Sequence, residues 1–532
     1  MDVTQNQPRY RRLAWLLIVS TAIARIVYLG WFCPFDLAPD EAHYWEWSRR
    51  LDWAYYSKGP LVAWVIRVSC EMFVSLASVL TGNEALAVRL PAVLFGSLLL
   101  AGLFTLTHLV YGDERLALVV AAVALTHPLV VAGSMLMTID APFLCAWMWA
   151  LVFAWRALFA GSRWAWSGTG LCVALGLLAK PTMVLWLPAF ALLLMTTPSL
   201  RGRLREPGGW IMLAIALLGA IPSLVWNLQH DWVTLRHTST HAGLGDMPTV
   251  TWFGPLRYLG TQVIVLLGVG FAIWLAAAWR HRPLREDNPR LLFLWWMSVP
   301  IVLFFGVFSL KNGGGEPNWP VAGYLAGCVL AAGWLRDLVN NISDRYRHLL
   351  TAGVLVTSFI GVLVIGAMHA PIQAQPILLH LAGLATEKHP MPIRRVDPTA
   401  RLRGWRHLAR EVDSIRMSLS NPVIVGERWT IASELAFYCA GHPEVFCMGV
   451  AVGDRHSQYD LWRPNPIADA AVYRGRSFIL VNVESTKVVG AFDQMDPVRR
   501  VEYRENGVLI ATWTIQVAHG FRGFEVKAGK SY

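Results

Sequence analysis

The sequence predicts a polytopic α-helical membrane protein that ends in a small soluble α/β domain. Hydrophobic residues make up 55% of the 532 residues and charged residues only 15%, whereas a soluble chain carries roughly 25% charged residues. Several apolar runs approach the ~20 residues that a helix needs to cross a bilayer. After about residue 371, proline and charge become more frequent and no further run of this kind follows.

We expect about eleven transmembrane helices in the first 370 residues. The first contains Arg25 and lacks a small-x-small cleavage site, which indicates an uncleaved helix rather than a signal peptide. Arg25 should pair either with an outer-face carboxylate or with a lipid phosphate. Residues 60–80 are apolar too, but Arg67 and Glu71 fall one turn apart, which favours a helix lying on the membrane surface. The expected spans lie at about 13–32, 88–110, 116–137, 142–158, 168–179, 182–196, 210–226, 257–279, 291–310, 320–338 and 349–370.

Arginine marks one set of the loops between these spans, and the alternate loops carry the acidic and histidine residues. Because basic loops stay in the cytoplasm, the N-terminus is expected inside and the C-terminal domain outside. The net charge of +11 is spread over these short loops, so it indicates membrane orientation and not a nucleic-acid partner. The Arg-rich loops are 9–12, 111–115, 156–163, 201–206, 279–287 and 336–348.

The polar tail, residues 371–532, has the pattern of a small α/β domain. Residues 422–427, 476–483 and 507–517 are rich in Val and Ile and predict strands. Residues 401–419 have the periodicity of an amphipathic helix. Cys439 and Cys447 lie in this tail and could pair in an oxidising compartment.

The first loop, from residue 38, is unusually rich in charge and aromatic rings. Its sequence APDEAHYWEWSRRLDWAYYSKGP places adjacent acids at Asp40 and Glu41 and a cation at Lys58. Charged groups beside a bilayer are costly and are often functional. One interpretation is a solvated loop with an interfacial belt of Trp and Tyr. The other is a reaction site in which Asp40 acts as a base and Lys58 binds a phosphate.

Five segments occur in an order that resembles a known family. They are DEAHYWEWSRRLDWAYYSKGPL, TIDAP, GLLAKPTMVLWLP, PSLVWNLQHDW and EPNWP, and they cover roughly residues 10–340. This order is similar to the bacterial glycosyltransferase family 39 group, which includes protein mannosyltransferase-like and 4-amino-4-deoxy-L-arabinose transferase-like membrane enzymes. SQYDLW, at 457–462, resembles the outer domain of the same group.

The resemblance implies a GT-C fold in the bacterial inner membrane. Residues 1–370 would form the transmembrane catalytic domain, with 38–80 as its first periplasmic loop, and residues 371–532 a periplasmic α/β domain. A polyprenyl-phosphate sugar would donate its sugar, with inversion, to an envelope acceptor such as a lipid A-like glycolipid, a glycan or a protein. Membrane lipids are the other expected partners.

The resemblance also implies roles for individual residues. Asp40 would be the catalytic base with Glu41 supporting it, and Lys58 would bind the donor phosphate. Asp140 in TIDAP would be a second catalytic acid, although a helix cap also explains an acid before Ala141-Pro142. Lys180 either belongs to the site or extends to the interface. The expected substrate contacts are Tyr55, Tyr56, Asn227, His237, Glu316 and Asn318.

A metal cofactor is disfavoured but left open. His237 and His241 lie four residues apart and are weak candidate ligands. The arabinose-transferase branch has a metal-coordinating Glu directly before its Lys, where this chain has Ser57. The sequence therefore assigns no cofactor and leaves a divalent metal as an open alternative.

Two other function classes compete with an enzyme. A lipid-sugar transporter or flippase would place ionisable residues near the middle of the bilayer, often within internal repeats. A receptor or envelope anchor would instead bind its partner through the outer domain. The acids gather at one membrane face and no repeat is visible, so the sequence favours the transferase.

Overall fold

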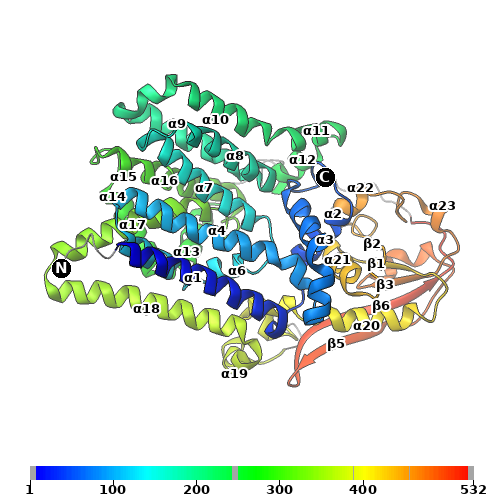
Figure 1. Cartoon of the computed structure of the whole chain (residues 1–532). Coiled ribbons are helices and arrows are strands. Elements are labelled where there is room, and N and C mark those ends of the chain that lie inside the picture. The colour runs from blue at the N-terminus through cyan, green and yellow to red at the C-terminus, as the bar shows by residue number, and fades with distance from the viewer. Residues whose placement is uncertain (1–6, 242–249, 387–388, 455, 525–532) are drawn as a thin grey trace. The chain divides into compact units, whose positions relative to one another are not determined.

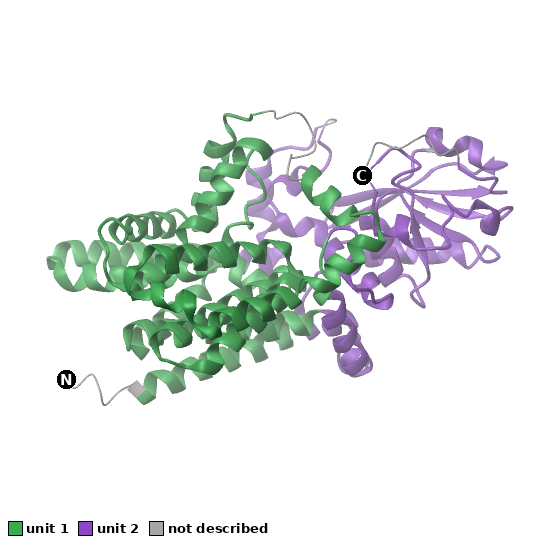
Figure 2. Ribbon diagram, turned by 90° about the horizontal axis from the view of Figure 1, so that it is seen from above, with its two compact units in different colours: residues 1–29, 58–62, 89–366 green, residues 30–57, 63–88, 367–532 purple. Residues whose placement is uncertain are grey.

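The computed structural model describes residues 7–241, 250–386, 389–454 and 456–524. Contacts divide the chain into two compact units (Figure 2). Unit 1 comprises residues 1–29, 58–62 and 89–366, and unit 2 comprises residues 30–57, 63–88 and 367–532. The first loop thus groups with the C-terminal tail, which the expected boundary at residue 370 does not anticipate.

Unit 1 is helical, and its long helices α1, α4, α7, α8, α10 and α18 run alongside one another (Figure 1). Small residues permit close packing between such helices: a Cβ added to Gly170 of α8 would lie 2.6 Å from the Met212 carbonyl oxygen of α10. The helices of this unit are α1 (Gln7–Val27), α4 (Ala85–Tyr111, whose first residues belong to unit 2), α5 (Glu114–Ala124), α6 (Pro128–Gly133), α7 (Asp140–Phe159), α8 (Arg163–Ala179), α9 (Trp186–Thr196), α10 (Pro207–Leu218), α11 (Ile221–Gln229), α12 (Val233–His241), α13 (Gly254–Val265), α14 (Val269–Arg280), α15 (Pro289–Trp296), α16 (Val299–Asn312), α17 (Val321–Asn341) and α18 (Asp344–His369).

The described residues contain eight helices long and apolar enough to cross a membrane, or up to ten if each of two bent pairs is one span. The sequence predicted about eleven. Segment 116–137 is interrupted before Pro128, because proline lacks the N–H that would extend the helix. Segment 168–179 lies in α8, which has only 17 residues. Conversely, α3 (Leu61–Thr81), expected on the membrane surface, has the length and composition of a span.

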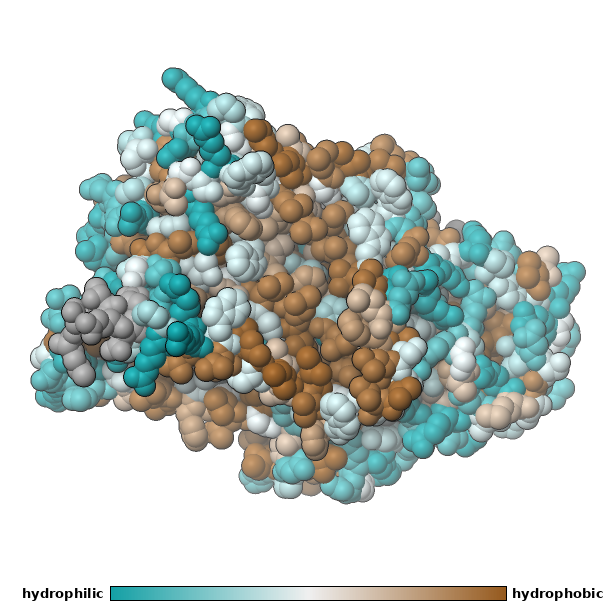
Figure 3. Space-filling model, in the orientation of Figure 1, coloured by the Kyte–Doolittle hydropathy of each residue, from teal (hydrophilic) through white to brown (hydrophobic). Residues whose placement is uncertain are grey.

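Apolar side chains cover much of the surface of the helical unit, as the brown areas over its helices show (Figure 3). Helix α18 is the extreme case, since only 6% of its most apolar window is buried. A helix that exposes so much apolar surface requires a nonaqueous environment, and here lipid supplies it. The chain is a multi-pass membrane protein.

Unit 2 contains a six-stranded sheet in the order β2-β1-β3-β6-β4, with β5 paired to β6. Strand β1 is parallel to β2 and β3, whereas β6 is antiparallel to β3, β4 and β5. Strands β1, β3 and β6 confirm the three strands that the sequence predicted. The strands are β1 (Val423–Gly426), β2 (Val445–Cys447), β3 (Phe478–Val481), β4 (Gln494–Met495), β5 (Arg499–Glu505) and β6 (Val508–His519).

The helices of unit 2 come from both ends of the chain. Helix α20 confirms the amphipathic helix expected at 401–419. Helix α2 from the first loop packs against α21 from the tail. Cys439 and Cys447 are both buried and free, so they form no disulfide in this structure. The helices are α2 (Pro39–Arg49), α3 (Leu61–Thr81), α19 (Pro371–Ala382), α20 (Trp405–Arg416), α21 (Trp429–Tyr438), α22 (Gln458–Leu461), α23 (Ala470–Tyr473) and α24 (Ser485–Val488).

Candidate active site

Three of the segments quoted above meet at the carboxylate of Asp140. Lys180 Nζ lies 2.8 Å from Asp140 Oδ1, and Asn318 Nδ2 donates to Asp140 Oδ2 at 2.8 Å. Asp140 is the first residue of α7, and its backbone N–H donates to Thr138 Oγ1 at 3.3 Å. Asp140 therefore stands at a helix start, as the capping alternative required, and also forms the centre of a polar cluster.

Local sequence explains how Lys180 reaches this cluster. Helix α8 ends at Ala179, and Lys180 is extended with φ −147° and ψ 125°. A residue before proline disfavours the helical region, so Pro181 enforces this conformation. Only 9% of the Lys180 side chain is exposed, against 25% for Asp140. Lys180 thus faces the protein, and the alternative that it extends to the interface does not describe it.

The glycine-rich loop that carries Asn318 has a conformation that suits glycine. Gly313, Gly314 and Gly315 have φ values of 68°, 124° and 62°, in a region that side chains disfavour. The turn ends α16 and leads to Asn318, which reaches Asp140. Glu316, the other candidate in this loop, is exposed to solvent.

The adjacent acids of the first loop stand at the start of α2. Glu41 is completely buried, and its Oε2 accepts a hydrogen bond from the Ala38 backbone N–H at 2.8 Å. This bond satisfies a donor that a helix N-terminus otherwise leaves unpaired. Glu41 consequently fixes the turn from which Asp40 projects, and Asp40 itself is half-buried. The arrangement agrees with a supporting role for Glu41.

The stretch before Lys58 is braced by aromatic rings and by the tail. The Tyr55 ring stacks on Trp47 at 4.4 Å between centroids, and its hydroxyl donates to the Trp47 carbonyl oxygen at 3.1 Å. The Tyr56 backbone N–H donates to Gln458 Oε1 at 2.7 Å. Tyr55 and Tyr56 are both buried. Their contacts hold the loop in shape, and their expected contact with substrate stays a prediction.

The residue after Lys58 lies directly against another segment of backbone, which restricts it to glycine. A Cβ on Gly59 would lie 2.1 Å from the Leu178 carbonyl oxygen near the end of α8. No real Cβ contact is that short, so glycine is required for this packing. Lys58 is half-buried and belongs to unit 1, whereas Asp40 belongs to unit 2. The convergence of these two side chains on one cleft stays a prediction.

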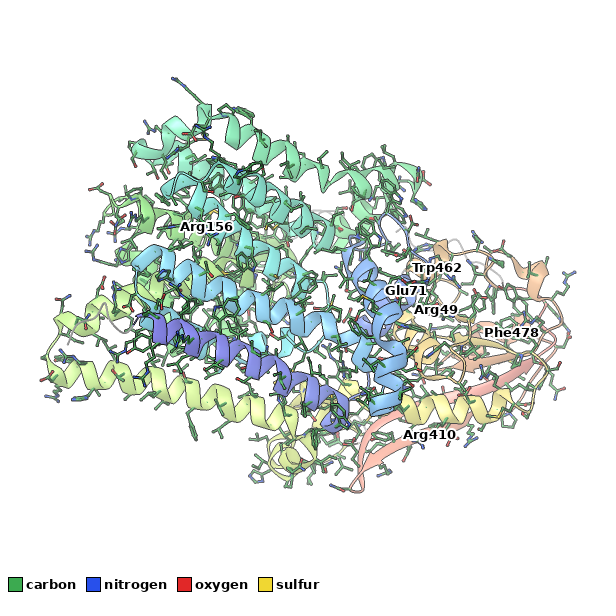
Figure 4. The ribbon with its side chains drawn as sticks, in the orientation of Figure 1. Arg49, Glu71, Arg156, Arg410, Trp462 and Phe478 are labelled. Carbon is green, nitrogen blue, oxygen red and sulfur yellow. The ribbon has the colours of Figure 1, made fainter. Side chains whose placement is uncertain are left out.

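A buried acid near the end of α2 is electrostatically perturbed. Glu46 is buried in unit 2, and burial raises its pKa, while Arg49 and Arg50 oppose the shift. Arg49 Nη1 lies 3.1 Å from Glu46 Oε2, and the Arg50 guanidinium carbon lies 4.6 Å from the centre of the Trp462 ring. Figure 4 labels Arg49 and Trp462 among the side chains of this unit. Glu46 is therefore paired with Arg49, and Arg50 lies over an aromatic ring of the tail.

Polar side chains of α11 and α12 include one that holds the backbone of both helices through hydrogen bonds. Asn227 Nδ2 donates to the Ser223 carbonyl oxygen at 2.8 Å, and its Oδ1 accepts from the Thr234 backbone N–H at 3.1 Å. Asn227 therefore links α11 to α12. His237 is half-buried in α12. The side chain of His241 lies outside the described residues.

The described residues can be compared with the ligand sets that metals require. Among the described residues, no group of three or more His, Cys, Asp or Glu side chains gathers as ligands would. Ser57, directly before Lys58, offers a hydroxyl, which is a much weaker metal ligand than a carboxylate. No step of the chemistry is therefore assigned to a metal.

A separate pocket of about 570 Å³ lies in the tail, at the starting ends of β1, β2 and β3. Arg416, Asn421, Glu444 and Arg476 are among its lining residues. None of the residues expected at the reaction site lines it.

Comparison with known proteins links this arrangement to a family. Residues 57–226 match the family described as dolichyl-phosphate-mannose-protein mannosyltransferase. The lipid A galacturonosyltransferase RgtD of Rhizobium johnstonii is 31% identical over 329 residues, which cover 61% of this chain and 65% of that protein. ArnT of Cupriavidus metallidurans, in a crystal structure with undecaprenyl phosphate, superposes with a TM-score of 0.60 over 94% of this chain and 97% of that one, at 15% identity.

The chain is similar in sequence to membrane glycosyltransferases and has the fold of ArnT. A second relative is the undecaprenyl phosphate-alpha-4-amino-4-deoxy-L-arabinose arabinosyl transferase of Pectobacterium carotovorum, 25% identical over 61% of this chain and 60% of its own length. The matches thus span less than two thirds of the length of both relatives. The family resemblance and the GT-C fold expected from the sequence are confirmed.

Two contacts, one in each unit, are not predicted by the sequence. The 2.8 Å contact of Lys180 with Asp140, 40 residues earlier, fixes the position of Lys180 in unit 1. Gln458 lies in the quoted SQYDLW segment, but nothing in the sequence connects it to Tyr56, from which it is separated by 402 positions.

Proposed function

We propose that this protein transfers a sugar from a polyprenyl-phosphate donor to a lipid A-like acceptor on the periplasmic side of the inner membrane. The donor class follows the arabinosyl transferases, whose name specifies an undecaprenyl-phosphate sugar. The acceptor class follows RgtD, a lipid A galacturonosyltransferase. The transferred sugar accordingly belongs among the acidic or amino sugars of the bacterial envelope.

The observation that carries the proposal is the cluster at Asp140. A carboxylate that contacts both the Lys180 ammonium and the Asn318 amide is held in a fixed position. Fixed charges of this kind favour a transition state because they need not reorganise during the reaction. These residues come from segments that carry the family resemblance, namely TIDAP, LAKPT and EPNWP.

The proposed reaction is a single inverting displacement. The acceptor hydroxyl attacks the anomeric carbon and gives its proton to Asp40, acting as general base. The bond between that carbon and the phosphate oxygen breaks, and polyprenyl phosphate leaves with one more negative charge. Lys58 stabilises this developing charge, which lowers the barrier more than it favours the bound substrate.

A transporter or flippase is the competing function, and an Asp40→Asn substitution separates the two. The amide cannot take a proton but keeps the size of the side chain, so we expect turnover to fall about 10²–10⁴-fold with donor binding unchanged. Purified protein, a polyprenyl-phosphate sugar and lipid A would be followed by mass spectrometry. Asp52→Asn, in the same loop, serves as the control. Undiminished turnover in Asp40→Asn would refute the assigned base.

Comparison of envelope glycolipids identifies the sugar. A strain lacking this protein should lose one sugar mass from a single glycolipid fraction. Loss from the lipid A fraction is expected. Loss from a protein or another glycan would reject the acceptor while leaving the transferase standing.

A further inference from the structure

Arg25 is a buried cation on the first membrane span. Only 5% of its surface is exposed, and it lies on the buried stripe of α1 together with Ala14 and Ile18. Leu29, in the π-helical segment that follows, is buried as well. Trp15 and Ile23 lie on other faces of the same helix and are exposed. Arg25 therefore points into the protein and not to the surrounding lipid.

The guanidinium of Arg25 lacks a partner in the part of the chain that the structure describes. Both terminal nitrogens, Nη1 and Nη2, are buried without a hydrogen bond, and Arg25 forms no ion pair among those residues. The sequence had left a carboxylate or a lipid phosphate as alternatives, and the structure supplies no carboxylate. An uncompensated buried charge is strongly unfavourable, so Arg25 requires an anion that the described residues do not supply.

We propose that Arg25 forms part of a binding site for the phosphate group of a lipid. A guanidinium offers two parallel N–H groups that match two phosphate oxygens, and the two vacant nitrogens are the pair such a contact uses. Lipid phosphates are the abundant anions at a bilayer surface. This site leaves the roles proposed for Asp40 and Lys58 in the transfer reaction unchanged.

The position of Arg25 along α1 suits a lipid that enters from the outer face. Seven residues separate it from Phe32, the end of the span, which corresponds to about 10 Å along the axis. A long arginine side chain covers a large part of that distance. The Phe32 end leads into the first loop and, with the N-terminus inside, is the outer end. The depth thus matches a headgroup drawn slightly into the helical unit.

Two kinds of lipid carry the required phosphate group, and each would give a different experimental result. The first is the polyprenyl-phosphate donor or its product, and this source rests on the proposed function. The second is an ordinary anionic phospholipid that fills a structural site. Undecaprenyl phosphate and phosphatidylglycerol serve as the two probes.

Thermal unfolding of the full-length protein in lipid-free detergent tests the proposal through Arg25→Met and Arg25→Lys. Because methionine removes a buried unpaired charge, Arg25→Met should melt at or above the wild-type Tm when no lipid is added. Added lipid should raise the wild-type Tm, since a ligand that binds only the folded state stabilises it. Arg25→Met should lose most of that rise, and Arg25→Lys should keep part of it.

Arg403→Met provides a matched control. Arg403 is also buried, but it is paired with Asp397 and Glu505. Its removal leaves two carboxylates unpaired and should lower the Tm without added lipid. It should leave the rise produced by lipid intact, which separates loss of a ligand contact from loss of a structural one.

Each outcome decides between the alternatives. Stabilisation by undecaprenyl phosphate alone assigns the site to the donor, and stabilisation by phosphatidylglycerol assigns it to a structural lipid, even if no sugar transfer is ever observed. The proposal is overturned if Arg25→Met lowers the lipid-free Tm as Arg403→Met does, or if it retains the full rise with both lipids. Failure of transfer with an intact lipid response would refute the proposed function only.

Discussion

At the scale of single residues, the Asp140 cluster shows that burial decides how much an ion pair contributes to stability. Exposed ion pairs contribute little because water already solvates both partners. Lys180 is nearly buried, and Asn318 occupies the second oxygen of the carboxylate. A pair in this setting depends strongly on each partner, because removing one leaves the other charge without compensation.

A double-mutant cycle of Asp140→Asn and Lys180→Met measures this dependence. Because the residues contact each other, we expect a coupling free energy of about 1–3 kcal/mol in the stability of the folded protein. Each single variant should also lower turnover, since both disturb the same carboxylate. Chemical denaturation and initial rates provide the two readouts. Strictly additive effects would show that the contact has no energetic weight.

The buried carboxyl of Glu46 predicts a pH dependence of stability. Burial raises its pKa in the folded state, so the folded protein holds this proton more tightly than the unfolded chain. Stability is then greatest below the ordinary pKa of about 4.3 and falls as pH rises through the raised value. Glu46→Gln does not titrate and should lack this component.

Melting temperatures between about pH 4 and pH 7.5 test the direction. The wild-type Tm, relative to that of Glu46→Gln, should decline as pH increases across this range. A relative Tm that rises with pH would mean that Arg49 and Arg50 outweigh desolvation and that the folded-state pKa is lowered.

At the scale of elements, the short helix α22 of the tail is tied to the first loop. Gln458 is almost completely buried, at 2% exposure, and accepts the Tyr56 N–H. The next residue, Tyr459, stacks on His43 of α2 with ring centres 5.6 Å apart. Two contacts from one element thus fix two points of a loop that includes Asp40 and leads directly to Lys58.

Gln458→Leu should loosen that loop. Leucine keeps the volume but removes the acceptor, so the Tyr56 amide loses its bond. We expect its hydrogen exchange to speed up by about tenfold and donor affinity to fall by a similar factor, the weight of one hydrogen bond. Gln458→Glu retains an acceptor oxygen and should restore both. Gln516→Leu, whose amide donates to the Asp496 carbonyl oxygen within the same unit, is the control.

The individual strands and helices also show how much of the fold could be predicted from the sequence. Hydrophobic β-branched runs predicted β1, β3 and β6, but β2 and β4 have only three and two residues, too few for a pattern. Strand β5, RRVEYRE, has one buried residue among seven and is polar, so it lacks the apolar signal of a buried strand. The start of a helix at Asp140 could be predicted locally, although the cap position is Ile139 and no side chain caps it. The Lys180 and Gln458 contacts could not, because they depend on tertiary packing.

At the scale of the whole molecule, the distribution of arginine predicts orientation. The 201–206 loop overlaps the 3₁₀ helix Pro198–Arg205 and carries several Arg residues. Basic loops near span ends stay in the cytoplasm, so we predict that the tail is periplasmic. This orientation would place the first loop and the tail on the same side, which the grouping of both in unit 2 requires.

Cysteine labelling tests this orientation. In a protein whose 7 native cysteines are replaced, Gly202→Cys and Lys487→Cys report on the basic loop and the tail. A membrane-impermeant maleimide added outside the inner membrane should label position 487 and leave 202 unlabelled until the membrane is permeabilised. Open space around Gly202 makes its substitution structurally mild. Labelling in the opposite order would invert the proposed topology.

The bond from Tyr56 to Gln458 has a consequence for biosynthesis. Its two ends are 402 positions apart, so at about 5–20 residues per second a ribosome needs roughly 20–80 s to produce the second after the first. The Asp36–Trp405 bond imposes nearly the same delay. During that interval the nascent segment around Asp40 is already translated but lacks its final scaffold. Truncated translation products would consequently insert into the membrane without a mature Asp40 region.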